Sequence, residues 1–343
     1  DNGLLVQYFN ANTPADQTLW AKAAKDAVTL KKIGATAVWF PPATKGAAGK
    51  EDMGYAPYDL YDLGEFNQKG SVGTRYGTKK EYLEAIDAMK VQGINVYADI
   101  AVRQKLGADS VEKVTAADFN AKDIPQMIGN KKIVGALSKF TFAGRRSKYS
   151  KFKWNWNHFA GIDWQQDDFK KRVCELSGMT EEEAEKKYKL SKYDYIIGSE
   201  LDLYNQEVYD ELMTWAKWYE DVTGVDGFRF QEAEKVPGWF IRDFAEAASN
   251  AGEEEKEIFT VGDFWHWRCD YINDYIASAD NQPSMFDVPL HFSFHDASVA
   301  EGEYDLSRLL DGSMMMSNPA KAVTFVENHE SQPGGVLESA VAE

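Results

Sequence analysis

Short apolar runs alternate with helical patterns along most of this chain, and this rhythm limits the folds open to it. Seven of the runs have the length and composition of buried strands. Because strands that are separated by helices pair in parallel, the alternation predicts a parallel sheet covered by helices. The predicted strands are Leu4–Phe9, Ala35–Phe40, Ile94–Ile100, Val225–Gln231, Ile258–Asp263, Met285–Val288 and Val323–Glu327.

Helices are predicted between several of these strands. Apolar residues recur at helical spacing from Trp20 to Leu30, and Gly34 ends that pattern. Thr78 and Glu81 have the spacing of a capping box, which indicates the start of a second helix. Two more helices are expected over Val208–Asp221 and Phe240–Ala251.

The rhythm stops between residues 104 and 206, where Lys, Asn, Trp and Tyr are frequent. One helix is expected there, opened by a capping box of Thr180 and Glu183. We therefore predict a (β/α)8 barrel of the TIM type, cut short after its seventh strand, with an inserted domain after the third strand. Residues 1–103 and 207–343 form the discontinuous barrel, and residues 104–206 form the inserted domain. No glycine-rich phosphate loop follows the first strand, which argues against a dinucleotide-binding fold.

Charge and composition exclude several classes of partner. The chain has 38 Lys and Arg against 55 Asp and Glu, a net charge of −17, which disfavours nucleic acid and anionic membranes. No apolar stretch reaches the roughly 18 residues of a membrane span. The first residues do not form a basic-then-apolar leader, which leaves open whether the chain is cytoplasmic or has a signal peptide that the sequence lacks. Cys174 and Cys269 have neither a disulfide framework nor metal-ligand spacing.

In a β/α barrel, chemistry takes place at the carboxyl ends of the strands. The third and fourth strands offer Asp99, Arg229 and Gln231 there, and the fifth and seventh offer Asp263 and Glu330. Carboxylates on different strands, with an Arg and a His nearby, are typical of a glycosidase site. Ion pairing at the barrel mouth is an equally open alternative.

Several long segments then resemble a known family. They are GYAPYDLYDLGEF (54–66), YGTKKEY (76–82), FKWNWNHFAGIDW (152–164), GVDGFRF (224–230), FTVGDFW (259–265), FDVPLHFSFHDAS (286–298) and FVENHESQP (325–333). From residue 3 onward, the chain resembles the α-amylase family of glycoside hydrolases, especially the bacterial liquefying type. The resemblance implies that residues 104–206 line the substrate cleft and that a C-terminal part of the family is missing.

The resemblance also implies an altered active site. Gln231 stands where the family has its nucleophile Asp, Asp263 where it has the acid/base Glu, and Glu330 where it has a transition-state-stabilising Asp. An amide cannot form a stable glycosyl ester, and shortening the acid withdraws it by roughly 1 Å, which can cost about 10²-fold in rate. Rescue by Glu232 is disfavoured, because side chains alternate along a strand and Glu232 is expected to face away from Gln231.

Sugar-binding positions are implied at residues that match the family better. Tyr55 is expected to stack on a sugar, with Arg229 and His329 bonding around it and Trp265 adding a second aromatic face. Gln104 stands where the family has a His, and we include it among the expected sugar-binding residues. For Trp154 and Trp156 packing is favoured over sugar contact.

Calcium is the cofactor that the resemblance implies, yet we predict none. Arg103 replaces an Asn that ligates the ion in the family, and a guanidinium cannot supply a ligand oxygen. Glu200 and Asp202 are candidate remnants of the site, and Arg103 is expected to pair with one of them.

Three functions remain open. The first is an α-amylase-like protein that is catalytically inactive or severely impaired and binds an α-glucan or maltooligosaccharide weakly. The second is an active α-1,4-glucan endohydrolase that uses rearranged carboxylates. The third is an engineered or designed scaffold with this fold. An extracellular location is implied by the resemblance alone.

Overall fold

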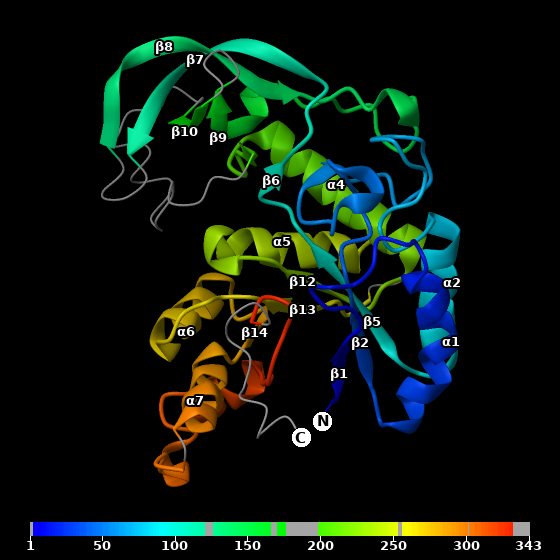
Figure 1. Cartoon of the computed structure of the whole chain (residues 1–343), viewed down its shortest axis with the longest axis vertical. Helices are drawn as coiled ribbons and strands as arrows, with labels where there is room; N and C mark the ends of the chain where they lie inside the picture. The colour runs from blue at the N-terminus through cyan, green and yellow to red at the C-terminus, as the bar shows by residue number, and fades with distance from the viewer. Residues whose placement is uncertain are drawn as a thin grey trace.

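The computed structural model describes residues 3–120, 126–165, 170–175, 198–252, 256–300 and 302–331. Its main feature is a curled parallel sheet of seven strands in the order β1-β2-β5-β12-β13-β14-β15 (Figure 1). The strands are β1 (Leu5–Gln7), β2 (Ala37–Phe40), β5 (Asn95–Ile100), β12 (Gly227–Phe230), β13 (Phe259–Gly262), β14 (Ser284–Phe286) and β15 (Ala322–Val323).

All seven predicted strands are therefore present, although the observed strands are shorter. The largest error is at the last strand, which ends at Val323 instead of Glu327. At the sixth, Val288 already belongs to a helix. Neighbouring strands are parallel throughout, so their carboxyl ends meet at one edge of the sheet.

Helices cover the outside of this sheet. The four predicted from periodicity and capping are α1 (Leu19–Lys32), α2 (Lys79–Val91), α4 (Gln206–Thr223) and α5 (Gly238–Ser249). The predicted capping box of Thr78 and Glu81 forms, since the Thr78 side chain accepts from the Glu81 amide and the Glu81 carboxylate accepts from the Thr78 amide. Three further helices were not predicted from the sequence: α6 (Cys269–Ser278), α7 (Val288–Val299) and α8 (Met314–Ser317).

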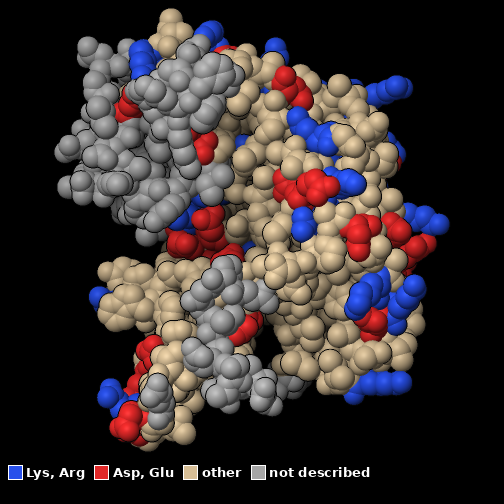
Figure 2. Space-filling view, in the orientation of Figure 1, with Lys and Arg blue, Asp and Glu red and all other residues tan. Residues whose placement is uncertain are grey.

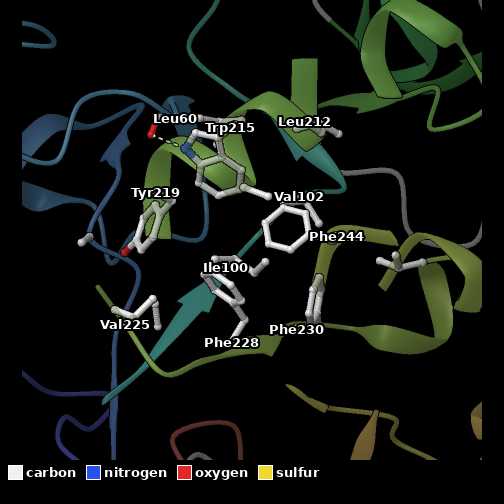
Figure 3. Close-up of a cluster of buried hydrophobic side chains, with 14 of the residues drawn as sticks. Leu60, Ile100, Val102, Leu212, Trp215, Tyr219, Val225, Phe228, Phe230 and Phe244 are labelled. Atoms are coloured by element: carbon white, nitrogen blue, oxygen red, sulfur yellow. Dashed lines mark hydrogen bonds between the residues drawn. The ribbon is translucent and has the colours of Figure 1, made fainter. Parts of the chain in front are cut away.

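Aromatic packing between α4, α5 and the central strands forms the core (Figure 3). The Phe244 ring of α5 lies 5.2 Å from Phe228 and 5.4 Å from Phe230, and 5.7 Å from Trp215 of α4. Trp215 also donates from Nε1 to the Leu60 carbonyl at 2.9 Å, so its one polar atom is satisfied. Removing a buried ring of this size costs about 3–5 kcal/mol, so these contacts fix how the helices sit on the sheet.

A second, antiparallel sheet is built from the chain between β5 and α4, where the strand–helix rhythm stops. Its order is β6-β11-β9-β10-β7-β8, and β7 and β8 form a long ribbon at one end of the molecule (Figure 1). The strands are β6 (Gln104–Lys105), β7 (Ser110–Asn120), β8 (Gln126–Lys139), β9 (Phe159–Gln165), β10 (Lys170–Glu175) and β11 (Ser199–Leu201); β3 (Lys45–Gly46) and β4 (Pro57–Asp59) form a separate pair. The helix expected at Thr180 lies outside the described residues, and the assignment of residues 104–206 to a separate domain stays a prediction.

Lys105 of β6 is a buried cation where the second sheet meets the barrel. Its ammonium group lies 5.2 Å from the Trp154 ring and about as far from those of Phe140 and Phe142, and it has no hydrogen-bond partner among the described residues. Burial lowers the pKa of Lys105 to about 7, against the opposing influence of Asp59; Arg145 lowers it further and Glu211 raises it. Burial of the charged form of Lys105 therefore lowers the folding stability by an amount that depends on pH.

We expect Lys105→Met to remove that pH dependence. The pKa of Lys105 is lower in the folded chain than in the unfolded chain, so between about pH 7 and 10 the unfolded chain binds more protons. Relative to the variant, the wild type should therefore gain stability as pH rises from 7 to 9, by up to about 1.4 kcal/mol per pH unit. Urea unfolding at several pH values measures the difference.

Lys80 provides the matched control, because its side chain is 84% exposed. Lys80→Met should change stability by nearly the same amount at every pH. Curves for Lys105→Met and the wild type that run parallel from pH 7 to 9 would show that the ammonium carries no burial cost.

Candidate active site

Arg229 of β12 is the centre of the barrel mouth. The parallel register places Arg229 directly beside Asp99 of β5, and its Nη1 donates to both Asp99 oxygens at 3.1 Å. Its Nη2 donates to Asp263, which follows β13, and to Oε1 of Glu330 at 3.0 Å. The side chains of Arg229, Asp99 and Asp263 are fully buried, while that of Glu330 is 27% exposed. One guanidinium therefore joins carboxyl groups from three segments.

These carboxyl groups do not share one protonation behaviour. Burial raises the pKa of Asp263 well above its usual value, more strongly than Arg229 lowers it, and Glu330 raises it further. Burial also acts to raise the pKa of Glu330, but Arg229 and His329 outweigh it and the pKa is lowered. Burial thus favours the protonated form of Asp263, whereas the lowered pKa of Glu330 favours its ionised form.

Aromatic side chains surround the cluster. The Tyr55 hydroxyl donates to Asp99 at 2.6 Å, and the His329 ring stacks on Tyr55 with centroids 5.3 Å apart and planes 8° apart. Burial, reinforced by Arg229, lowers the pKa of His329 to about 4, so the ring is neutral near pH 7. Trp265 donates from Nε1 to Glu330 at 2.6 Å. The sequence-predicted residues Tyr55, Arg229, Trp265 and His329 therefore lie together at the mouth.

The residues after β12 differ from the strand geometry that was expected. The strand ends at Phe230, and Glu232 has a φ of 47°, in the left-handed region. Strand alternation, on which the expectation for Glu232 was based, therefore no longer applies at this residue. Its carboxylate is 25% exposed and accepts from Nη2 of Arg103 at 3.0 Å. Gln231 is half-buried, and its backbone N–H donates to the Ile100 carbonyl at 3.3 Å.

Other predicted positions lie at the edge of the site or in its support. Gln104 is buried and donates from Nε2 to the Tyr55 carbonyl at 3.1 Å, so it holds the backbone of Tyr55. Trp154 is buried against Phe152 and His158, as the packing interpretation predicts. Trp156 is 37% exposed. Phe292 is a neighbour of Trp265 that the sequence did not reveal, because it carries no signal in the strand pattern.

The residues around Arg103 do not fit a calcium ion. The Arg103 guanidinium is 3.5 Å from Glu200 and 3.0 Å from Glu232, and the residue is only 4% exposed. Burial raises the pKa of Glu200 to about 7, although Arg103 acts to lower it. Asp202, also buried, accepts from the Tyr204 amide at 3.2 Å. Within the described residues, no group of three or more acidic, His or Cys side chains is arranged to hold a metal ion. The predicted pairing of Arg103 with Glu200 is present.

A parallel β/α sheet with carboxyl groups and an Arg gathered at its carboxyl ends defines a protein of glycosidase type. No protein-family model matches the chain. It is 42% identical to the α-amylase of Geobacillus stearothermophilus over 98% of its own length and 61% of that relative. It is 36% identical to the cytoplasmic α-amylase of Escherichia coli, with 99% of this chain and 69% of the relative covered.

The chain belongs to the α-amylase family, as its resemblance predicted. A solved structure of the Geobacillus thermoleovorans α-amylase, complexed with acarbose, covers 95% of this chain and 60% of that protein, with a TM-score of 0.55 and 18% identity, and thus shares the fold. The chain therefore spans roughly two thirds of the length of these relatives.

Arg103→Met should destabilise the chain, because two partly buried carboxylates would lose the cation between them. We expect a loss of about 3 kcal/mol in the free energy of unfolding, measured in urea. Arg308→Met is the control: its pair with Asp311 is exposed (73% and 63%) and should contribute little to stability.

The wild-type melting temperature should be the same in calcium chloride and in EDTA, since the guanidinium of Arg103 already provides the positive charge. A melting temperature that rises with calcium would contradict this interpretation.

Proposed function

We propose that this α-amylase-family chain binds α-glucans at its barrel mouth and hydrolyses them very slowly or not at all. The observation that carries the proposal is Gln231, which follows Arg229 by two residues where the resemblance places the nucleophile. A neutral amide neither attacks the anomeric carbon to form a stable ester nor stabilises an oxocarbenium ion as an anion does.

The arrangement of Asp263 and Glu330 supports the same proposal. A retaining glycosidase needs its two carboxyl groups about 5–5.5 Å apart, and an inverting one needs them about 6.5–9.5 Å apart, so that a sugar and water fit between. Here both side chains accept from the same Arg229 nitrogen. Asp263 is also fully buried, so its carboxyl group is not exposed to a leaving oxygen at the mouth.

Binding of an α-glucan rests on the groups that surround this cluster. Tyr55 and Trp265 offer partly exposed aromatic faces, and the exposed part of Glu330 can accept from sugar hydroxyls. The relatives are named α-amylases, and the G. thermoleovorans structure contains acarbose. Charged side chains of both signs are interspersed among the described residues on the face in Figure 2, which offers no broad basic patch for nucleic acid.

An active endohydrolase with rearranged carboxylates is the second candidate, and Glu232 is the observation that favours it. The left-handed backbone at Glu232 turns its carboxylate toward Arg103 at the mouth, where a quarter of the side chain is exposed. If Glu232 acted as nucleophile or base, Glu232→Gln would abolish the turnover of the unchanged chain. In the leading proposal this variant leaves the activity at background.

The relatives do not establish the cellular location of this chain. No helix in the described parts of the chain is long and apolar enough to cross a membrane. The E. coli relative is named a cytoplasmic α-amylase, so the extracellular location implied by the resemblance is not supported.

Restoring the three carboxyl positions tests the catalytic part of the proposal. On a chromogenic maltooligosaccharide, Gln231→Asp combined with Asp263→Glu and Glu330→Asp should exceed the unchanged chain by at least ~10³-fold, because members of a catalytic unit act together. The matched control carries Gln231→Asn with the same two partners and should stay at background. Clear turnover by the unchanged chain that Asp263→Ala removes would contradict the proposal.

Calorimetry with maltoheptaose tests the binding part. The unchanged chain should release heat, and Tyr55→Ala should weaken binding by about 10-fold because one aromatic face is lost. Absence of both heat and a thermal shift would favour the scaffold interpretation over binding.

A further inference from the structure

One loop carries two residues of the barrel mouth. The chain leaves the sheet at Val323, the last residue of β15, and reaches the mouth at His329 and Glu330. We call residues 324–330 the mouth loop. Val326, near its middle, is 54% exposed. Because exposed loops are more mobile than the elements they connect, this loop keeps one position only where the rest of the fold binds it.

His291 of α7 binds the mouth loop at its middle through two contacts. Its Nδ1 lies 2.7 Å from the carbonyl oxygen of Val326. Its ring stacks on Phe325, with centroids 4.8 Å apart and planes 12° apart. His291 itself is only 2% exposed. One buried side chain therefore holds both the backbone and a ring of the loop.

The His291 ring is neutral and carries its proton on Nδ1. Burial lowers the pKa of His291, although the bond to Val326 acts to raise it; His295 lowers the pKa further and Glu327 raises it. The ring is therefore neutral near pH 7. Since a carbonyl oxygen only accepts, the nitrogen that faces Val326 must be the donor.

The first turn of α7 gives His291 a fixed base. Asp287 caps the helix, and its buried carboxylate also accepts from the amides of Met314 and Met315 at 3.0 and 2.9 Å. The Asp287 amide donates to the Val323 carbonyl at 2.9 Å, and the His291 amide donates to the Asp287 carbonyl at 3.1 Å. His291 is thus tied to the strand end from which the mouth loop starts.

His291 also packs against Trp265 of the mouth. The two rings lie 5.8 Å apart with planes at 87°. Trp265 donates from Nε1 to Glu330 at 2.6 Å, and Glu330 accepts from Arg229 at 3.0 Å. His291 therefore contacts the donor of the Trp265–Glu330 bond directly, and it contacts the loop that carries the acceptor.

We propose that His291 is a positioning residue for the α-glucan site. It places Trp265 and the mouth loop so that the exposed part of Glu330 faces the sugar hydroxyls. The inference rests on the proposed function, since it assigns a role within the same binding site. His291 is buried and acts on affinity through Trp265 and Glu330, without touching the ligand.

Two substitutions separate the two contacts in calorimetry with maltoheptaose. His291→Phe keeps a ring for stacking and loses the donor, whereas His291→Asn keeps a donor close to the position of Nδ1 and loses the ring. We expect His291→Phe to weaken binding by about 10-fold and His291→Asn to recover part of that loss. Wild-type affinity in both variants would overturn the proposal. His291→Leu, which also lacks the donor, replaces the Phe variant if that variant does not fold.

His158→Phe is the matched control, because His158 is also 2% exposed and bonds through Nε2 to Glu207 at 3.0 Å. It should lower the melting temperature and leave the affinity for maltoheptaose unchanged. An equal loss of affinity in the His158 and His291 variants would assign the effect to general destabilisation and overturn the proposal.

The indole N–H proton of Trp265 gives a readout without any ligand. Its NMR resonance, identified by its absence in Trp265→Phe, should move upfield in His291→Phe as the bond to Glu330 weakens, and stay in place in His158→Phe. An unmoved resonance in His291→Phe overturns the positioning role, whether or not maltoheptaose binds. A shifted resonance in a chain that releases no heat with maltoheptaose keeps the positioning role and overturns the proposed function.

Discussion

The buried guanidinium of Arg229 is the interaction on which the barrel mouth depends. A charge with no exposed surface needs opposite charges nearby, and the carboxyl groups of Asp99, Asp263 and Glu330 accept from the two terminal nitrogens of Arg229. These groups follow or belong to different strands, so the ion cluster also fixes the relative height of the strand ends. Tyr55, Trp265 and His329 are positioned in turn through Asp99, Glu330 or stacking.

Arg103 is a second buried cation, and it joins carboxylates from different segments as Arg229 does. Arg103 follows β5 in the barrel, Glu232 follows β12, and Glu200 belongs to β11 of the antiparallel sheet. One side chain thus ties both sheets together at the level of the mouth. It also binds the carboxylate of Glu232, whose backbone is in the left-handed region.

The parallel sheet could be predicted from the sequence because buried strands need runs of apolar residues, and seven such runs are separated by helical patterns. The helix α7 could not, since Val288 and Leu290 alternate with Asp287 and Pro289 directly after β14, and this alternation resembles the end of a longer strand. The antiparallel sheet was missed because its strands carry many polar residues, as in the eleven-residue β7. Cross-strand pairing, which local pattern does not encode, specifies them.

At the barrel mouth too, some residue positions could be predicted from the sequence and others could not. Position along the strands placed Asp99, Arg229 and Asp263 at one edge, because the carboxyl ends of parallel strands meet there. The direction of Glu232 depends on one backbone torsion after the strand has ended, which strand alternation cannot predict. The contact of Arg103 with Glu232 joins residues 129 positions apart, and nothing in the local sequence indicates it.

The exchange of side-chain lengths at Asp263 and Glu330 has a wider consequence. Against the family pattern that the chain resembles, one position loses a methylene group and the other gains one, so the pair keeps its total volume and its number of acidic groups. Close packing and charge balance around Arg229 tolerate such a permutation, because both depend on sums over the cluster. Catalysis depends in addition on which atom lies where, so an exchange that conserves only the sum leaves packing and charge unchanged while it moves the reacting groups. Stability and catalysis therefore place different demands on the same pair of side chains, and selection for stability alone would not detect the difference.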